Sequence, residues 1–545
     1  MNNHKQSFEW KQYFPHAKPR EEQVEAINFA LHAFYNSNKK YVIVEAGTGV
    51  GKSAVGLTVA KYIAATMMST DAHTSGAYFL TTQKILQDQY TKDFSSTPGG
   101  MYSIKSSSNY SCKFVKGNSC AESLQSIRGV DKKSPFFKAC TFNCNYRKAK
   151  DEFLKSKAGV TNFPYFLAET SYSGKITPRE LLVVDEAHNT AEELSKFVEV
   201  TLSERFSKQV LKVEMPVINT QLQALNWVKD IYSVKLFSHT RHIEKMLGKY
   251  ADLRDKIQEF AGLAKQFDML DKHTCKLRRF LELYEKDNWV VNVIPADGRS
   301  GRKIEFKPID VAPYAEPMLF RLGNKILCMS ATILNVDAHC KMLGIPRDEC
   351  EFISIPSPFP VKNRPIITCG IGSMSAKQID NTLPQLVKAV KEILRAHPKE
   401  KGIIHCHTFK IANYIKRNIR SNRLLAHDST NREETLRKHL RASSPTVLLS
   451  PSMTEGVDLV DDASRFQIIC KVPYPYLGDK LIRKKMNKWP WWYSLITAKT
   501  IVQATGRSIR NKDDTAVTYI LDGDWDMFYS KNTRIFPRGF RDCIT

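Results

Sequence analysis

Glycines, a lysine and a serine stand at close spacing in the stretch EAGTGVGKSA, Glu45 to Ala54. Backbone N–H groups around such glycines can point at phosphate oxygens, while Lys52 neutralises charge and Ser53 can ligate Mg²⁺. The preceding KKYVIVEA favours a buried strand and the following SAVGLTVAKYIAA favours a helix, which is the context that this chemistry needs. The stretch therefore predicts a nucleotide-binding loop formed by Ala46, Gly47, Thr48, Gly49, Val50, Gly51, Lys52 and Ser53.

Two acids follow a second apolar stretch, LLVVDEAHN, where a strand from Leu181 to Val184 should end. Asp185 at the strand tip can hold Mg²⁺, usually through water, and Glu186 can orient and activate an attacking water. A chance acidic turn after a strand would look the same in isolation. Beside the glycine loop, the pair instead predicts the catalytic acids of an ATP hydrolase.

Arginines three residues apart occur in QATGRSIR, where Gln503, Gly506, Arg507 and Arg510 are expected on one helix. Arginines of this kind can reach a γ-phosphate from another domain and stabilise transition-state charge. Alone, such a segment is more often a solvated basic helix. The adjoining NKDD matches a guanine-reading pattern, but without the other GTPase landmarks we expect ATP.

Four of the twelve cysteines fall in one short region, at Cys112, Cys120, Cys140 and Cys144. Zinc sites usually contain C-x-x-C pairs, and this group has none. Four thiolates can also hold an iron–sulfur cluster, or they can remain unligated. From spacing alone, all three readings stay open.

The 545 residues are enough for two to four domains, and Lys plus Arg exceed Asp plus Glu by 25. This excess of positive charge favours polyanionic partners, nucleic acid first, over a merely solvated surface. The first residues lack the layout of a signal peptide, and no apolar run approaches the length of a membrane span. We therefore expect a cytoplasmic protein without a membrane partner.

Read in order, these motifs resemble a superfamily 2 DNA helicase of the XPD/DinG type, the iron–sulfur helicase family. Other nucleotide loops have glycine at the position of Ala46, and the loop with alanine here resembles that of superfamily 2 helicases. Asp185 to His188 spell DEAH. Further segments resemble the family's other motifs: KPREEQVEAI with Arg20 and Gln23 (adenine sensing), LTTQKILQDQ with Gln87 (DNA contact), VTNFPYFLAE, CMSATI, GIIHCHTF, and SPSMTEGVDLV with Gly456 and Asp458.

The resemblance implies an α/β fold with two RecA-like motor domains, parallel sheets and ATP between them. The expected boundaries are 1–100, 160–195 and 300–350 for the first motor domain, 101–159 for an iron–sulfur insertion, 196–299 for a helical arch-like insertion, and 351–545 for the second motor domain. The family carries a [4Fe–4S] cluster at the place of the four cysteines, which favours that cluster over zinc. The prolines of FISIPSPFPVKNRP, Phe352 to Pro365, predict an irregular linker.

A heptad stripe runs through the arch-like segment at Ile243, Met246, Tyr250, Leu253, Ile257, Phe260, Ala264 and Phe267. It could form an intermolecular coiled coil, but Gly248 and Gly262 favour a hairpin packed on its own chain. Downstream, Trp489, Trp491, Trp492 and Tyr493 lie beside Arg483, Lys484, Lys485 and Lys488. These could stack bases and hold phosphates, or simply pack the second motor domain.

The resemblance implies a monomeric, ATP-dependent helicase that moves 5′ to 3′ on single-stranded and forked DNA, in repair, replication or recombination. RNA is an alternative track. The expected roles are Lys52 and Ser53 for phosphate and Mg²⁺, Asp185 and Glu186 for metal and water, and Arg507 and Arg510 for the γ-phosphate. His188, Gln503, Gln23, Gly456 and Asp458 complete the expected nucleotide site. The alternative function is a nucleic-acid-stimulated ATPase clamp, or a redox-sensing binding protein, with little unwinding.

Overall fold

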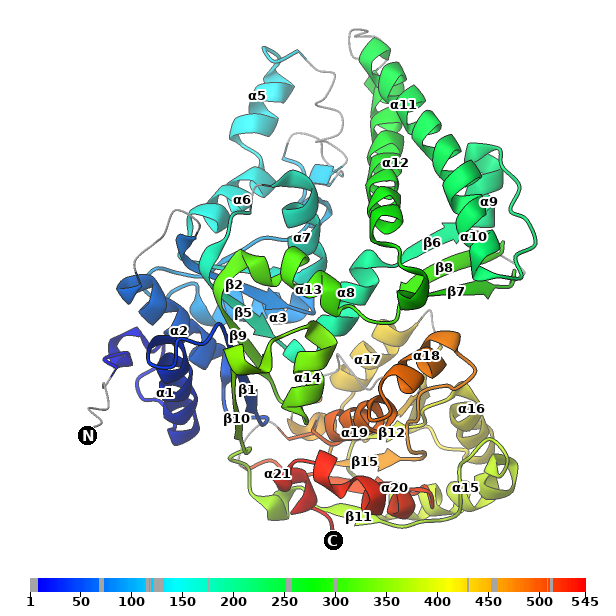
Figure 1. Cartoon of the computed structure of the whole chain (residues 1–545). Coiled ribbons are helices and arrows are strands. Elements are labelled where there is room, and N and C mark those ends of the chain that lie inside the picture. The colour runs from blue at the N-terminus through cyan, green and yellow to red at the C-terminus, as the bar shows by residue number, and fades with distance from the viewer. Residues whose placement is uncertain are drawn as a thin grey trace.

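The computed structural model consists of two α/β domains, one above the other, with two projections that rise from the upper one (Figure 1). It describes residues 8–67, 73–113, 117, 119–121, 131–174, 176–250, 257–297, 301–428, 431–451, 459, 461–506, 508–509 and 513–545. Both domains contain a sheet with parallel strands, as expected for two motor domains.

The upper domain contains a seven-stranded sheet in the order β10-β1-β9-β5-β2-β4-β3. Every strand pair in it is parallel. The strands are β1 (Tyr41–Ala46), β2 (Thr74–Thr81), β3 (Tyr102–Ser103), β4 (Ala158–Asn162), β5 (Arg179–Asp185), β9 (Gly323–Ser330) and β10 (Cys350–Ile355). The carboxyl ends of β1 and β5 carry the glycine loop and the two acids, so the sheet topology brings both motifs to one edge.

Helices cover both faces of this sheet, which is why β1 is buried along its whole length. Val42 and Val44 belong to the core under one group of helices, whereas Tyr41 and Ile43 point into the opposite core. The helices of this domain are α1 (Glu21–Tyr35), α2 (Lys52–Thr66), α3 (Lys84–Phe94), α7 (Phe163–Ala168), α8 (Thr190–Val198), α13 (Ala312–Met318) and α14 (Val336–Leu343).

The lower domain is built on a six-stranded parallel sheet in the order β11-β16-β15-β12-β14-β13. Its strands are β11 (Ile366–Thr368), β12 (Gly402–His405), β13 (Leu424–Ala426), β14 (Val447–Ser450), β15 (Phe466–Ile469) and β16 (Val517–Ile520). Its helices are α15 (Ile379–Ala396), α16 (Phe409–Asn418), α17 (Arg432–Arg441), α18 (Lys480–Lys488), α19 (Trp492–Thr505), α20 (Trp525–Asn532) and α21 (Arg538–Arg541).

The first projection contains the four cysteines and the helices α5 (Pro135–Phe142) and α6 (Asn145–Lys155). Ser134 caps α5 by accepting a hydrogen bond from Phe137 N at 3.1 Å, and Pro135 occupies the first turn, where its missing N–H costs nothing. Cys144 stands at the N-cap of α6. The two helices therefore meet at the third and fourth cysteines.

The second projection is the predicted helical hairpin, formed by α11 (Ser233–Tyr250) and α12 (Ile257–Leu283), which pack against each other. Ile243, Phe260, Ala264 and Phe267 of the heptad stripe are buried in one apolar core that continues into the first motor domain. Leu253 lies outside the described residues. The stripe thus packs within its own chain, as the glycines indicated.

Besides the expected helices, the insertion contains an antiparallel sheet that the sequence did not predict and that forms the base of the hairpin. Its order is β6-β8-β7, with β6 (Val200–Ser203), β7 (Trp289–Ile294) and β8 (Lys303–Pro308). Two short helices, α9 (Glu204–Phe206) and α10 (Gln221–Trp227), complete it. Ile304 and Phe306 of β8 alternate with half-buried neighbours, which lets one face pack on the core.

The linker prediction for Phe352 to Pro365 is wrong over its first residues. Strand β10 runs to Ile355 and pairs with β1, so the first sheet extends past the predicted boundary at residue 350. Irregular backbone begins only at Pro356, where the prolines start. Within the described ranges, no helix is both long and apolar enough to cross a membrane.

Candidate nucleotide site between the two motor domains

The glycine loop leaves β1 at Ala46 and enters α2 at Lys52, which confirms the predicted strand, loop and helix. Gly49 and Gly51 have φ values of 92° and 82°, a conformation that favours glycine. A Cβ on Gly51 would lie 2.5 Å from Gln23 Nε2. Lys52 Nζ donates to the carbonyl oxygen of Ala46 at 3.4 Å, a long hydrogen bond that a phosphate can replace.

Arg20 and Gln23 contact the glycine loop from the start of α1. The Arg20 guanidinium donates to the Gly49 carbonyl oxygen, and Gln23 Nε2 donates to the Gly51 carbonyl oxygen at 3.4 Å. Gln23 Oε1 accepts from Arg20 N at 2.9 Å, so both ends of this buried amide are in use. Gln23 thus holds the loop in position; its adenine-sensing role stays a prediction.

The two acids lie at the tip of β5, beside the loop. Asp185 is buried and accepts hydrogen bonds from Tyr90 Oη and from Glu186 N, both at 3.0 Å. Burial and the neighbouring Glu186 raise the pKa of Asp185 to about 6, against the opposing effect of Lys52. Glu186 has a left-handed φ of 53°, and its side chain is 30% exposed. The acids therefore occupy different environments, as their separate predicted roles require.

A series of contacts runs from Glu186 to the second motor domain. Glu186 Oε2 lies 3.3 Å from His188 Nδ1, which in turn lies 2.7 Å from Ser330 Oγ. The Ser330 hydroxyl accepts from Thr332 N at 3.0 Å, and Gln503 Nε2 of α19 donates to Thr332 Oγ1 at 3.3 Å. The DEAH, SAT and QATGR segments are thus physically connected across the two domains.

Helix α19 ends earlier than the sequence suggested. Gln503 is helical, but the helix stops at Thr505 and Gly506 forms its C-cap, so the prediction of one helix through residue 510 is wrong. Glycine in a helix is costly, which favours an end at this position. Four predicted residues, Arg507, Arg510, Gly456 and Asp458, lie outside the described part of the chain.

A cavity of about 1010 Å³ lies between the two motor domains and joins these motifs. The first domain contributes the loop, the acids and Thr332, and the second contributes Gln503, Thr505 and Gly506. Phe359 and Arg364 also line the cavity, and neither carries a sequence signal that we recognised. The same holds for two residues that contact its motifs from outside: Tyr90, bonded to Asp185, and Lys499, which donates to the His188 carbonyl oxygen at 3.4 Å. Each is distant in sequence from the motif it meets.

The assignment of Gln87 to DNA contact is wrong. Its side chain is fully buried, where Nε2 donates to Ser103 Oγ and to the Ile104 carbonyl oxygen, each at 2.7 Å. Its Oε1 accepts from Asn162 Nδ2 at 3.1 Å. Gln87 therefore ties α3 to the edge of the sheet, because a buried amide must satisfy its hydrogen bonds internally.

The four cysteines are neighbours in the fold. Cys120 and Cys144 have their Sγ atoms 3.1 Å apart. Burial raises the pKa of the Cys120 thiol, and the nearby thiols of Cys144, Cys140 and Cys112 raise it further. Among the described residues, however, no three metal-ligating side chains are arranged to hold a metal ion.

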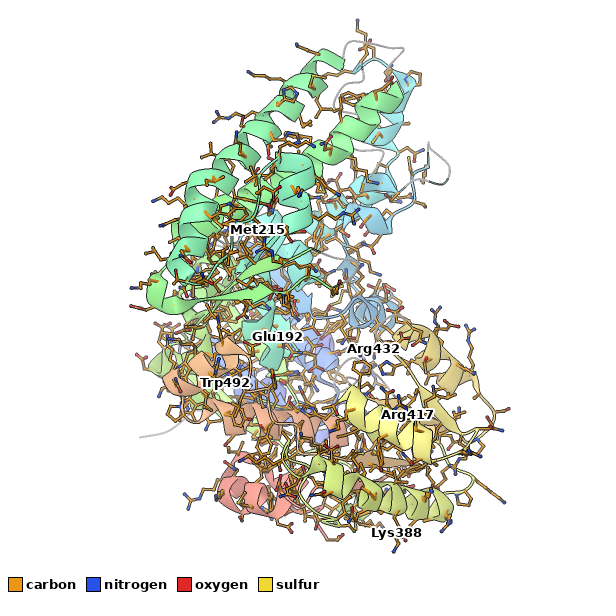
Figure 2. All side chains as sticks on the ribbon, turned by 90° about the vertical axis from the view of Figure 1, so that its right-hand side faces the viewer. Glu192, Met215, Lys388, Arg417, Arg432 and Trp492 are labelled. Carbon is orange, nitrogen blue, oxygen red and sulfur yellow. The ribbon has the colours of Figure 1, made fainter. Side chains whose placement is uncertain are left out.

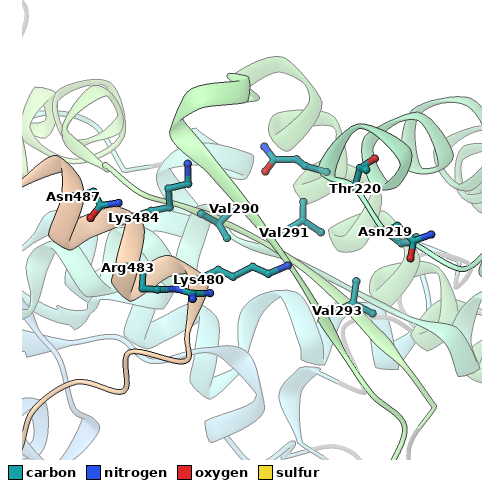
Figure 3. A pocket seen from close by; sticks show the side chains of 11 residues that line it. Asn219, Thr220, Val290, Val291, Val293, Lys480, Arg483, Lys484 and Asn487 are labelled. Carbon is teal, nitrogen blue, oxygen red and sulfur yellow. The ribbon is translucent and has the colours of Figure 1, made fainter.

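A second cavity, of about 350 Å³, lies between α18 and the sheet of the second projection (Figure 3). Lys480, Arg483, Lys484 and Asn487 form its wall on one face of α18, at the three- and four-residue spacing of a helix face. Val290, Val291 and Val293 of β7 oppose them, with Ile218, Asn219, Thr220 and Gln221 at the margin. We call this cavity the α18 groove.

The tryptophans beside α18 pack rather than point into this groove. Trp492 is buried; Figure 2 shows it below Glu192 in that view. Lys485 Nζ lies 5.6 Å from the Trp492 ring centroid, and Lys488 Nζ lies 5.2 Å from that of Trp489. Lys488 also pairs with Asp310 at 2.7 Å. The basic residues of α18 therefore fall into two sets. Lys485 and Lys488 pack against the tryptophans, whereas the other basic residues of the helix face the groove.

Two family models match the chain: the type III restriction enzyme res subunit over residues 16–215, and the helicase C-terminal domain over residues 390–538. A probable ATP-dependent helicase of Methanocaldococcus jannaschii is 23% identical, across 94% of this chain and 93% of that protein. The ATP-dependent DNA helicase DinG of Photobacterium profundum is 24% identical, across 55% of this chain and 45% of that protein. An XPD helicase structure superposes with a TM-score of 0.63 at 16% identity, across 95% of this chain and 98% of the other.

Proposed function

This chain belongs to the superfamily 2 helicases of the XPD/DinG type, and from that premise we propose that it couples ATP hydrolysis to movement along single-stranded DNA and to duplex unwinding. One observation carries the proposal. The cavity that contains Lys52 and Asp185 is closed on its other side by Gln503 of the second domain, whose amide contacts Thr332. Hydrolysis inside it can therefore change the contact between the two domains.

The side chains divide the chemistry as follows. Lys52 binds the phosphates, Glu186 accepts a proton from the attacking water, and His188 orients Glu186 through its 3.3 Å contact. Ser53 and Asp185 are the residues that would hold Mg²⁺, which neutralises phosphate charge when bound. Their hydroxyl and carboxylate oxygens fit a hard cation. Arg507 and Arg510 are the proposed γ-phosphate residues, with Gly456 and Asp458 completing the site.

We assign the nucleic-acid track in part to the α18 groove. Lys480, Arg483 and Lys484 are exposed, and none of their side chains makes a hydrogen bond or ion pair with any described residue. The residues around the groove include no acid. Such a surface favours a phosphate backbone, while the valines of β7 offer apolar contact to sugars and bases.

The remaining expectations about the motor are part of the same proposal. The motor runs 5′ to 3′ on single-stranded or forked DNA, with RNA as the alternative track. Both sides of the nucleotide cavity come from one chain, which is compatible with a monomeric motor. A cytoplasmic location is part of the proposal.

The proposal is tested with purified protein on tailed duplexes. We expect ATP turnover to rise when single-stranded DNA is added, and 5′-tailed duplexes to be unwound in preference to 3′-tailed ones. Stimulated hydrolysis without any unwinding would instead support the clamp. No stimulation by either DNA or RNA would contradict both readings.

Reversing the three charges of the α18 groove, with K480E, R483E and K484E together, should weaken single-stranded DNA binding. If each cation contacts one phosphate, the slope of log affinity against log salt should fall by about two. The matched control is K388E, K391E and R395E, three exposed charges on one face of α15, away from the groove (Figure 2). Equal effects of the two variants would show that only net charge matters.

We further propose that Cys112, Cys120, Cys140 and Cys144 hold a [4Fe–4S] cluster. Four neighbouring thiols are the ligand set that such a cluster takes. Burial and Cys144 raise the pKa of Cys140, and the nearby Arg147 opposes them. The Sγ atoms of Cys120 and Cys144, 3.1 Å apart, would have to separate. Even tetrahedral zinc needs about 3.8 Å between sulfurs, so either metal requires this movement. When bound, the cluster would link α5 and α6 to the segment that contains Cys112 and Cys120.

Anaerobically purified protein should therefore contain about four iron and four sulfide ions per chain and be brown. C144S should lose most of the iron, since three thiolates then remain. C369S, which removes an exposed cysteine of the second domain, is the control and should retain it. One zinc ion per chain in place of iron would show that the four cysteines bind zinc instead of a cluster.

A further inference from the structure

The segment that connects the two motor domains lies directly on the glycine loop. Ser357 Oγ donates to the Thr48 carbonyl oxygen at 2.7 Å, and Gly47 N donates to the Ile355 carbonyl oxygen at 3.0 Å. The Phe359 ring packs so closely on Gly49 that a Cβ there would lie 2.0 Å from it. This connector, residues 356–365, is therefore part of the nucleotide site as well as a tether.

Phe359 also reaches the second domain. It is 7% exposed and packs with Ile509 and Ala516, which lie after α19 and before β16. The connector thus contacts the loop on one side and the second motor domain on the other. A ligand that contacts both the glycine loop and the connector will therefore influence how the two domains are positioned.

Arg364 occupies the end of this connector, two residues before β11 begins. Its backbone is fixed on both sides, because Ala516 N donates to the Asn363 carbonyl oxygen at 2.9 Å and Thr518 N donates to the Pro365 carbonyl oxygen at 3.0 Å. The side chain lies along the nucleotide cavity, with Nη2 near Gly539.

Among the described cations that line this cavity, Arg364 is the one whose side chain makes no hydrogen bond or ion pair with a described residue. Its Nε is buried and, among the described residues, has no hydrogen-bond partner. The other described cations at the cavity are engaged: Lys52 donates to the Ala46 carbonyl oxygen, Arg20 to the Gly49 carbonyl oxygen, and Arg538 lies 3.6 Å from Asp542. Leaving a buried charged donor unsatisfied costs free energy, so the site favours an anionic acceptor.

We propose that Arg364 is a nucleotide-binding residue that donates to an oxygen of the phosphate chain of ATP. The proposal rests on the nucleotide site described above and names a further residue of it. A planar guanidinium pairs with phosphate oxygens through parallel N–H donors, which an ammonium cannot reproduce. Because Arg364 lies two residues before β11, nucleotide bound to it links the glycine loop to the first strand of the second motor domain.

The test compares R364A and R364K with K362A, which removes an exposed lysine of the same connector that does not line the cavity. Nucleotide affinity is measured by calorimetry with ADP and with ATP. We expect R364A to bind both about tenfold more weakly than wild type, R364K to bind with intermediate affinity, and K362A to match wild type. Without nucleotide, the melting temperature of R364A should stay near that of wild type, because no described hydrogen bond is lost.

Two results separate this inference from the proposed function. If wild type hydrolyses ATP and R364A binds nucleotide as tightly as K362A does, the role of Arg364 is overturned while the helicase proposal stands. If wild type binds no nucleotide, both are overturned. Inorganic tripolyphosphate, used as a competitor without base or ribose, should inhibit R364A about tenfold less well than wild type. Equal inhibition would overturn the assignment to the phosphate chain.

Discussion

Replacing Glu186 with glutamine should lower kcat for ATP hydrolysis by about 10² to 10⁴, the usual contribution of a positioned general base. Glutamine keeps the shape and the contact with His188, but it cannot accept a proton. The Glu186 side chain is 30% exposed and faces the cavity, whereas Asp185 is buried under Tyr90. Glu186 is therefore the acid that a water molecule can reach.

The affinity for ATP should survive E186Q, since Lys52 and Ser53 remain and one negative charge is removed from the cavity. Steady-state hydrolysis and equilibrium ATP binding measure the two effects separately. E392Q, an exposed position on α15, is the matched control and should resemble wild type. Hydrolysis by E186Q at the wild-type rate would show that another group activates the water.

The parts of the site that the sequence predicted correctly are those that lie within one short segment. Lys52 follows its glycines directly, and Asp185 ends its own strand, so local spacing alone determines where they lie. Tyr90 reaches Asp185 only through the packing of α3, and Arg364 reaches the cavity only through the path of the connector. No pattern around either residue records that packing, which is why sequence reasoning missed them.

The wrong predictions also arose because local sequence does not show long-range packing. Gln87 lies in a segment that resembles a DNA-contacting motif, yet its side chain points into the domain, because a motif does not record which way a side chain faces. Strands β6 and β8 pair across about 100 residues of intervening chain, so neither shows its partner locally. By contrast, the hairpin of α11 and α12 was predictable because its apolar spacing is continuous.

The contact between Gln503 and Thr332 suggests how hydrolysis reaches the second domain. It lies at the end of the series from Glu186 through His188 and Ser330, and Lys499, one turn earlier in α19, contacts the His188 backbone. The proposed role of Arg364 adds a second connection through the connector. The Gln503–Thr332 contact and Arg364 lie at separate places around one cavity. A bound nucleotide would therefore hold the two domains together at more than one point.

Replacing Lys52 with alanine should reduce ATP hydrolysis by about 10³-fold or more and abolish unwinding, because the charge that offsets the phosphates is lost. The fold should tolerate this change. Lys52 is half-buried, and its described hydrogen bond to Ala46 is long, at 3.4 Å. The melting temperature without nucleotide should therefore stay near that of wild type, while the stabilisation by added ADP is lost.

The matched control is K61A, a lysine of the same helix that donates to Thr97 at 3.0 Å, away from the cavity. It removes equal charge and should retain nucleic-acid-stimulated hydrolysis. Turnover is measured with and without single-stranded DNA for wild type and both variants. If K52A hydrolysed ATP as fast as K61A, the activity would not arise in this cavity. The roles assigned to Glu186, Gln503 and Arg364 would then fail with it, since each depends on nucleotide bound at Lys52.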